Sequence, residues 1–427
     1  MVFGVGLMTP IIVLGTFGVL AHASAGKVPL TYILALVAML PTALSYAQMA
    51  RAFPVAGSSY TYVRKAIDAR LGFLTGWAIL LDYLFLPMAI WLIGTAYLHT
   101  AVPGVPKVIW LFGFIGTTTF INWLGLKFAA GLNVVLVSLQ TLVLCAFVTL
   151  CIHYILGNPL HPIFSTVPLK SDGSHWTLIL NGAAIACYSY LGFDAVSTLT
   201  EETRDASRVV PIAIILVTLI GGVLFVGSAY FVQIAHPGAT FGDPDAAAYE
   251  IARNIGGDAF VMIFVVGLVI GQFASGIAAQ ASASRLLYAL GRDNVLPKRV
   301  FGHLSARFGT PTYSIGLCAV IALLALRLDV TTSTSFINFG AFLTFILVNL
   351  SVVLHYWRGE GRRGVSAAIK FLICPLFGMA ADTALMGSLD RKALILGISW
   401  LLIGFAYLSY LTGGFRRPPP ELGLDRG

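Results

Sequence analysis

The feature that most constrains this chain is a series of apolar stretches, each roughly 20 residues long, that recurs from one end to the other. A stretch of this length crosses a hydrocarbon core of about 30 Å as an α-helix, and in lipid only helices and closed barrels satisfy every backbone hydrogen bond. We therefore predict an all-α polytopic membrane protein with about twelve transmembrane helices. The predicted spans are approximately 3–22, 30–50, 71–100, 108–126, 131–155, 177–200, 211–234, 256–289, 312–328, 333–356, 367–388 and 393–413.

The distribution of charge supports the same topology. Charged residues make up only 10% of the chain, whereas an ordinary soluble domain has about a quarter. When both termini are placed in the cytoplasm, most of the 26 Lys and Arg residues fall in the connections on the cytoplasmic side, as the positive-inside rule requires. The net charge of +8 then reflects loops that face anionic lipid, and it calls for no nucleic-acid partner.

The chain is predicted to form one transmembrane domain, residues 1–413, followed by a cytoplasmic tail, residues 414–427, that is Pro-rich and disordered. No HExxH or paired His/Asp run is present, so we expect neither a metal site nor a cofactor. The cysteines lie within or at the ends of predicted helices without metal-type spacing, which indicates packing positions. They are Cys145, Cys151, Cys187, Cys318 and Cys374.

Two of the predicted helices contain residues that interrupt a helix. The first reads "GVGLMTPIIVLGTFG" (4–18), and the sixth reads "CYSYLGFDAVSTL" (187–199), with Gly192 beside Asp194. Interruptions five helices apart fit two inverted five-helix repeats that share a midplane site, with two further helices at the C-terminus. The alternative is that these are ordinary glycines and prolines, which are common in transmembrane helices.

Asp194 is the main candidate for a functional residue. A charge at mid-bilayer costs about 2.5–3.5 kcal/mol on insertion scales, so a retained one normally faces the bundle interior or a water-filled path. Asp194 precedes Glu201 by seven residues, which places it roughly 10 Å deeper than the charged helix end. We therefore favour a functional role over membership of the helix-end cluster of ion pairs that includes Glu201 and Glu202.

Other polar residues have competing interpretations. Asp82, about a third of the way along the third helix, is a proton-coupling or substrate carboxylate, or an internally hydrogen-bonded acid that fixes helix packing. Glu201 and Glu202 are interpreted as bridges to basic residues at the cytoplasmic gate. Tyr188 and Tyr190 precede the break and offer aromatic faces beside the carboxylate that would suit an ammonium group, or each is a packing residue or an interface anchor.

Three long patterns carry a family resemblance over nearly the whole chain. They are "FPVAGSSYTYVRKAIDARLGFLTGW" (53–77), "GFDAVSTLTEETRDASRVVPIAI" (192–214) and "SRLLYALGRDNVLPKRVFGHLSARFGTP" (284–311). In these patterns the chain resembles the amino acid–polyamine–organocation transporters, and within them the bacterial putrescine importers. The resemblance implies alternating access around discontinuous first and sixth helices in a bacterial inner membrane. It places Asp194 at the functional acid of related amine and arginine carriers and Tyr188 at their substrate-facing aromatic residue.

The chain departs from the family pattern at two points. Amino-acid carriers of the family usually have a Gly-Ser-Gly turn in the first helix that receives the substrate carboxylate, whereas this chain reads "LMTPIIVLGTFG" (7–18). This departure favours an amine that has no carboxylate. Gln140 aligns where some proton-coupled relatives have a lysine, so coupling through that lysine is not expected.

The residues and the resemblance together predict a secondary transporter that imports a small organic cation, with putrescine or a related polyamine as the expected substrate. Asp194 would bind one ammonium group and Tyr188 would stack on the substrate, while freed carbonyls near Met8, Thr9 and Gly192 add negative potential. Asp82 is a candidate for the second ammonium or for proton coupling. The alternatives are an amino acid permease of the same superfamily, a channel or sensor, and a membrane-embedded enzyme. The last is disfavoured because no nucleophile and base pair is visible.

Overall fold

A computed structural model describes residues 2–55, 58–125, 130–158, 162–170, 176–200, 203–292, 294–359 and 364–419. The described chain is built from helices, and nine of its helical segments are long and apolar enough to cross a membrane, with a shorter apolar segment at Thr312–Leu326. Every predicted span has a helical counterpart, so the prediction of an all-α polytopic membrane protein is confirmed.

The first half of the described chain contains α1 (Val2–Met8), α2 (Ile12–Gly15), α3 (Phe17–Ala23), α4 (Val28–Ala52), α5 (Ser58–Ala66), α6 (Ala69–Ala101), α7 (Lys107–Trp123), α8 (Ala130–Gly157), η1 (Val167–Leu169), α9 (Trp176–Tyr190) and η2 (Ala195–Leu199). The second half contains α10 (Ala206–Ala235), η3 (Pro244–Ala246), α11 (Ala247–Arg292), α12 (Lys298–Phe301), α13 (Thr312–Ala322), η4 (Leu323–Leu326), α14 (Val330–Val352), η5 (Val353–Gly359), α15 (Val365–Ala368), η6 (Ile369–Ile373), α16 (Cys374–Gly387) and α17 (Arg391–Leu411).

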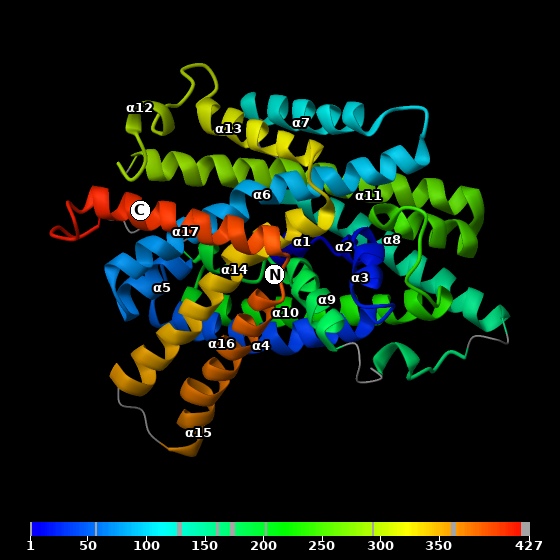
Figure 1. The fold of residues 1–427 in the computed structure, drawn as a ribbon, viewed down its shortest axis with the longest axis horizontal. Coiled ribbons are helices and arrows are strands. Elements are labelled where there is room, and N and C mark those ends of the chain that lie inside the picture. The colour runs from blue at the N-terminus through cyan, green and yellow to red at the C-terminus, as the bar shows by residue number, and fades with distance from the viewer. Residues whose placement is uncertain are drawn as a thin grey trace.

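The first predicted span is broken into α1, α2 and α3, which lie near the middle of the molecule (Figure 1). Thr9 has a positive φ of 50°, and Pro10 has no backbone N–H to continue the helical hydrogen bonds. A second discontinuity, at Thr16, separates α2 from α3. The predicted break in the first helix is therefore confirmed, and the span contains one more interruption than the sequence suggested.

The sixth predicted span is broken as well. Helix α9 ends at Tyr190, and the chain continues through Gly192, whose φ of 130° is a conformation that favours glycine, into the short 3₁₀-helix η2. Asp194 stands at the start of η2. The break predicted at Gly192 is confirmed.

Helices at equivalent positions of the two predicted repeats pack against each other. The most extensive helix pair is α4 with α10, the second and seventh spans, and the next is α6 with α11, the third and eighth. The fourth and ninth, α7 and α13, are also in contact and lie together at the top of Figure 1. Because five crossings reverse the direction of the chain, this pairing is what two inverted repeats would produce.

Two helical segments extend beyond the predicted spans. Helix α5 forms within the predicted loop 51–70 and packs against α6. Helix α11 contains a kink at Gly257 (φ 68°, ψ −173°), so Ala247 to Gly256 is a separate helical piece before the predicted eighth span. Neither segment is long and apolar enough on its own to signal a membrane crossing, which is why hydropathy did not reveal them.

The last two spans attach to the core through aromatic contacts. Helix α16 packs against α14 and α4, and α17 packs against α14 and α6. Trp77 and Trp400 stack at 4.9 Å, and the indole N–H of each donates to the backbone carbonyl of the other at 2.9 and 2.8 Å. In the predicted tail, the backbone carbonyl of Phe415 accepts a hydrogen bond from the Arg70 side chain at 2.9 Å. Residues 420–427 lie outside the described residues, and the boundary at 413 stays a prediction.

Candidate functional site

The break in the first helix is attached to α11 on one side and to the sixth-helix break on the other. Thr9 Oγ1 lies 3.1 Å from Ser275 Oγ of α11, and α1 contacts both η2 and α10. The Met8 side chain is buried against Gly221 of α10, where an added Cβ would lie 2.9 Å from its sulfur. The side chain of Met8 therefore packs against α10. Only the backbone of Met8, at the break, is left to contact a ligand.

Asp194 is held at the start of η2 by local hydrogen bonds. The backbone N–H of Gly192 donates to Asp194 Oδ1 at 3.0 Å, so the positive φ of Gly192 turns this amide toward the carboxylate. The side chain of Asp194 is half-buried. Ser197, which donates to the Asp194 carbonyl, also lies 2.6 Å from Ser58 Oγ, and this contact fastens α5 to η2. The segment that carries the carboxylate is therefore fixed from two directions.

Asp82 faces the same region from α6. Its side chain is half-buried, and its Oδ1 atom has no hydrogen-bond partner in the part of the chain that the structure describes. The carboxyl groups of Asp82 and Asp194 lie within electrostatic range of each other. Neither forms an ion pair with a described Lys or Arg residue. The two acids that the sequence singled out separately thus lie close enough to interact electrostatically.

Two tyrosines complete this arrangement. Tyr188 of α9, which is 6% exposed, lies within electrostatic range of Asp82, and Tyr83 of α6 lies within range of both acids. Sequence reasoning did not select Tyr83, although its place next to Asp82 was the available signal. Tyr190 instead donates to the carbonyl of Tyr32, so it is a packing residue. We call Asp82, Tyr83, Tyr188 and Asp194 the acidic site.

The predicted gate residues Glu201 and Glu202 lie outside the described residues. The structure therefore gives no geometry for their assignment as a cytoplasmic gate, and that role stays a prediction. The nearest described elements on either side are η2 and α10.

The molecule is closed at the face that carries the α10–α11 connection, residues 236–246. Phe241 packs edge-on against Phe17 at 6.3 Å, and Tyr97 donates to the carbonyl of Leu14 at 2.8 Å. An added Cβ on Gly18 would lie 2.3 Å from the Pro244 carbonyl oxygen, so the connection sits directly on α3. We call this end the closed face. The broken helices therefore meet an occluding layer on this side of the acidic site.

Two buried amide side chains lie beside Gly15 and Gly271. Gln272 of α11 is fully buried beside Gly15, and neither its Oε1 nor its Nε2 has a partner among the described residues. Gln140 of α8, where a lysine was considered, packs on Gly271 with its Oε1 also unpartnered. These neutral groups supply hydrogen-bonding capacity without charge.

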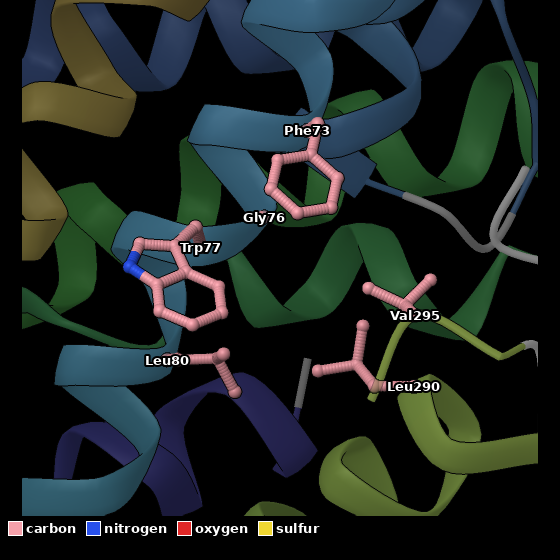
Figure 2. A pocket seen from close by; sticks show the side chains of 6 residues that line it. All are labelled: Phe73, Gly76, Trp77, Leu80, Leu290 and Val295. Atoms are coloured by element: carbon pink, nitrogen blue, oxygen red, sulfur yellow. The ribbon is translucent and has the colours of Figure 1, made fainter. Parts of the chain in front are cut away.

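A hollow with a different lining lies between α6 and the end of α11 (Figure 2). Its lining consists of Phe73, Gly76, Trp77, Leu80, Leu290 and Val295. These residues are apolar or glycine, and Trp77 commits its N–H to Trp400. An ionic substrate would find no charged partner in that lining, so the acidic site is the better candidate.

Comparison with known proteins agrees with the geometry. The sequence model of the family described as amino acid permease matches residues 1–412. The chain is 39% identical to the low-affinity putrescine importer PlaP of Escherichia coli K12 over 421 residues, which cover 98% of this chain and 93% of that protein. It is 25% identical to the branched-chain amino acid permease BcaP of Lactococcus lactis over 440 residues, 97% of this chain and 93% of that protein.

A third relative is the methylthioribose transporter of Bacillus subtilis, 26% identical over 412 residues, or 91% of this chain and 86% of that protein. All three relatives are transporters by name, and the family is one of permeases rather than enzymes. The helices, their two breaks and the full-length match lead to one conclusion. The chain is a multi-pass membrane transporter that belongs to the amino acid permease family.

Proposed function

We propose that this transporter imports a small diamine, putrescine or a close relative, across the bacterial inner membrane by alternating access. One observation carries the proposal: Asp82 and Asp194 are half-buried, lie within electrostatic range of each other and have no ion-pair partner among the described residues. Two like charges in one apolar site repel each other, and a dication between them removes that repulsion. A substrate with two positive charges is therefore the natural complement of the site.

The proposed binding mode uses each group for one part of the substrate. Asp194 binds one ammonium group and Asp82 binds the other, and the rings of Tyr188 and Tyr83 pack beside the four-carbon stem. An aromatic face within about 6 Å of an ammonium contributes roughly 0.5–2 kcal/mol. Backbone carbonyls freed at the two helix breaks add negative potential, as unwound segments do in related transporter folds. The E. coli relative is named a putrescine importer, which supports the same substrate class.

The first helix supports an amine over an amino acid. An α-carboxylate requires free backbone amides at a helix start, but the segment after the break begins with Pro10, which has no N–H. Helix α2 is also only four residues long, so it adds little dipole. The amino acid permease alternative would need another cation or amide cluster for the substrate carboxylate.

The expected direction of transport follows from the membrane potential and topology. With both termini in the cytoplasm, the closed face is external and Glu201 and Glu202 stand at the internal gate. An inside-negative potential of 100 mV favours entry of a dication by about 2.3 kcal/mol per charge, or nearly 5 kcal/mol in total. Proton coupling is proposed in addition, since it would allow accumulation when the potential is low.

The proposal is tested by uptake of radiolabelled putrescine into proteoliposomes, with spermidine, ornithine, arginine and alanine as unlabelled competitors. Asp194→Asn and Asp82→Asn each keep the shape of the side chain but remove its charge. Leaving one buried charge unpaired costs about 2–5 kcal/mol, so we expect uptake at low substrate to fall by about 25-fold or more. Asp258→Asn is the matched control, because Asp258 is largely exposed and pairs with Arg253 at the surface.

The competitors separate the two functions. Saturable putrescine uptake that amino acids compete for poorly, and that both site variants lose while Asp258→Asn retains it, supports the diamine. Preferential transport of alanine or arginine would instead establish the amino acid permease. Normal putrescine uptake by Asp194→Asn would reject the binding mode.

A further inference from the structure

A second buried acid lies outside the acidic site, in the penultimate helix. Asp382 of α16 has no exposed surface. Thr42 Oγ1 of α4 donates to Asp382 Oδ2 at 2.9 Å, and Asn349 Nδ2 of α14 donates to the same oxygen at 3.1 Å. Asn349 Nδ2 also donates to Thr42 Oγ1 at 2.8 Å. This network, which we call the α4–α14–α16 network, joins three helices through one carboxyl group.

The hydrogen bonds of the network leave one carboxyl oxygen unused. Both donors reach Oδ2, whereas Asp382 Oδ1 and the amide oxygen of Asn349 have no partner among the described residues. Gly378 leaves room for this amide, because an added Cβ would lie 3.0 Å from both of its polar atoms. An ionised carboxylate buried without a cation is costly, and a proton on the bare oxygen removes that cost.

Among the described residues, no cation contributes to the electrostatics of Asp382. The described titratable groups that interact with it are Tyr46 of α4 and Cys187 of α9, and both are neutral in their protonated forms. Helix α14 contributes no titratable side chain. Arg51 stands nine residues along α4 from the network, or about 13 Å, and Lys370 of η6 precedes Asp382 by twelve residues, or about 18 Å. No described Lys or Arg residue forms an ion pair with Asp382.

Tyr46 connects the network to the acidic site. It lies within electrostatic range of both Asp382 and Asp194. Its ring meets the ring of Phe193 edge-on at 5.7 Å, and Phe193 directly precedes Asp194 at the break in the sixth helix. Thr42 stands one helical turn before Tyr46 on the same side of α4. A change at Asp382 that moves α4 therefore reaches the segment that carries Asp194.

We propose that Asp382 is a proton-binding site that couples proton movement to amine transport. In one conformation its carboxylate binds a proton from one aqueous phase, forming an O–H bond on Oδ1. In the other conformation the same O–H bond breaks, and the proton leaves to the opposite phase with no other bond changed. The protonated form holds α4, α14 and α16 together as seen here. The proposal rests on the proposed amine uptake for its substrate, but its first test does not.

The first test is infrared difference spectroscopy of the purified transporter in lipid as the pH is raised. Wild type is expected to lose the C=O stretching band of a buried carboxylic acid, and Asp382→Asn is expected to lack that change. The surface variant Asp258→Asn should match wild type. An identical difference spectrum in Asp382→Asn, or a carboxylic acid band that never changes with pH, would overturn the proposal, because Asp382 would then be a permanent structural acid.

The second test measures transport in proteoliposomes that contain a pH-sensitive dye. Wild type should move protons when putrescine is added, and Asp382→Asn should lose this flux while it retains exchange of internal for external putrescine. Proton flux at the wild-type level in Asp382→Asn would contradict the coupling role. Absence of putrescine exchange in wild type would refute the proposed substrate instead, and the infrared test would still decide on Asp382.

A milder variant covers the case in which Asp382→Asn does not fold. Thr42→Val keeps the acid and removes one of the two donors to Oδ2. The carboxylate then has one donor fewer, so the pH midpoint of the infrared change is expected to move to higher pH. An unchanged midpoint would mean that the observed band belongs to another acid.

Discussion

The contact between Gly18 and the α10–α11 connection gives a quantitative prediction about alternating access. An alanine at this position would place its Cβ 2.3 Å from the Pro244 carbonyl oxygen and 2.3 Å from Ala247 Cβ. Real Cβ atoms do not approach other atoms this closely, so the connection has to move away from α3. Overpacking of this kind costs typically about 1–3 kcal/mol.

The cost applies only to the conformation in which this face is closed. In a transporter that alternates between two states, Gly18→Ala should therefore shift the population toward the state in which the connection has lifted. A difference of about 1–3 kcal/mol corresponds to a shift of about 5- to 150-fold in the equilibrium. The variant is expected to fold, because the opened state accommodates the added methyl group.

The assay is the rate at which a membrane-impermeant maleimide labels a cysteine introduced at position 95. Thr95 lies near the outer end of α6 and is 2% exposed, so Thr95→Cys should react only when the closed face opens. The background carries Ala in place of Cys145 and Cys374, the native cysteines that are not buried. In that background Gly18→Ala should raise the labelling rate by the factor given above.

Gly113→Ala is the matched control, because an added Cβ on that residue of α7 would meet no atom within 4 Å. It should label at the parent rate. If Gly18→Ala also labels at the parent rate, the contact with Pro244 does not hold the face closed and the reasoning is refuted. If the thermal stability falls while the labelling rate stays constant, the added methyl group destabilises the whole fold and does not shift the transport equilibrium.

Three further predictions follow from single contacts. Trp400→Phe removes the N–H that donates to the Trp77 carbonyl, and should lower the free energy of unfolding by about 0.5–1.5 kcal/mol in thermal denaturation; an unchanged transition would show that the pair is not stabilising. Burial lowers the pKa of His236, although the charge of Glu250 opposes this shift. The His236 ring stacks on Phe241, so its neutral form favours the closed face. Labelling of the Thr95→Cys variant, normalised to that of a free thiol at the same pH because only the thiolate reacts, should therefore rise as the pH falls below about 6.5, and His236→Gln should abolish that dependence. Tyr188→Leu should raise the KM for putrescine by about 2- to 30-fold and Tyr188→Phe by less, and equal effects would exclude a role for the ring.

The sequence predicted the parts of this protein that depend on local chemistry. Apolar length set the positions of the membrane helices because each span must cross the same thickness of hydrocarbon. Pro10 and Gly192 marked the two breaks because one lacks an N–H and the other tolerates a positive φ. Asp194 was identified first by its depth, since a charge two turns inside an apolar run requires an explanation.

The limits of sequence reasoning are clearest at Tyr83 and Asp382. Tyr83 was not selected although it adjoins Asp82, and Asp382 was given no role because the penultimate helix lies outside the predicted repeats. The hydrogen bond between Thr42 and Asp382 joins residues 340 positions apart, and local sequence patterns do not predict such a contact. The roles of Glu201 and Glu202 stay predictions for a different reason, since they lie outside the described residues.

By itself, therefore, the sequence determined which segments enter the membrane, where two of them break and how deep the acids lie. These properties follow from the identity and spacing of neighbouring residues. Only the tertiary structure decided that Asp82 and Asp194 lie within electrostatic range of each other, that Asp382 joins three helices and that one face is closed. Residue spacing fixes the position of a side chain along its own helix, whereas the partner it meets depends on how that helix rotates and packs against helices far away in the chain.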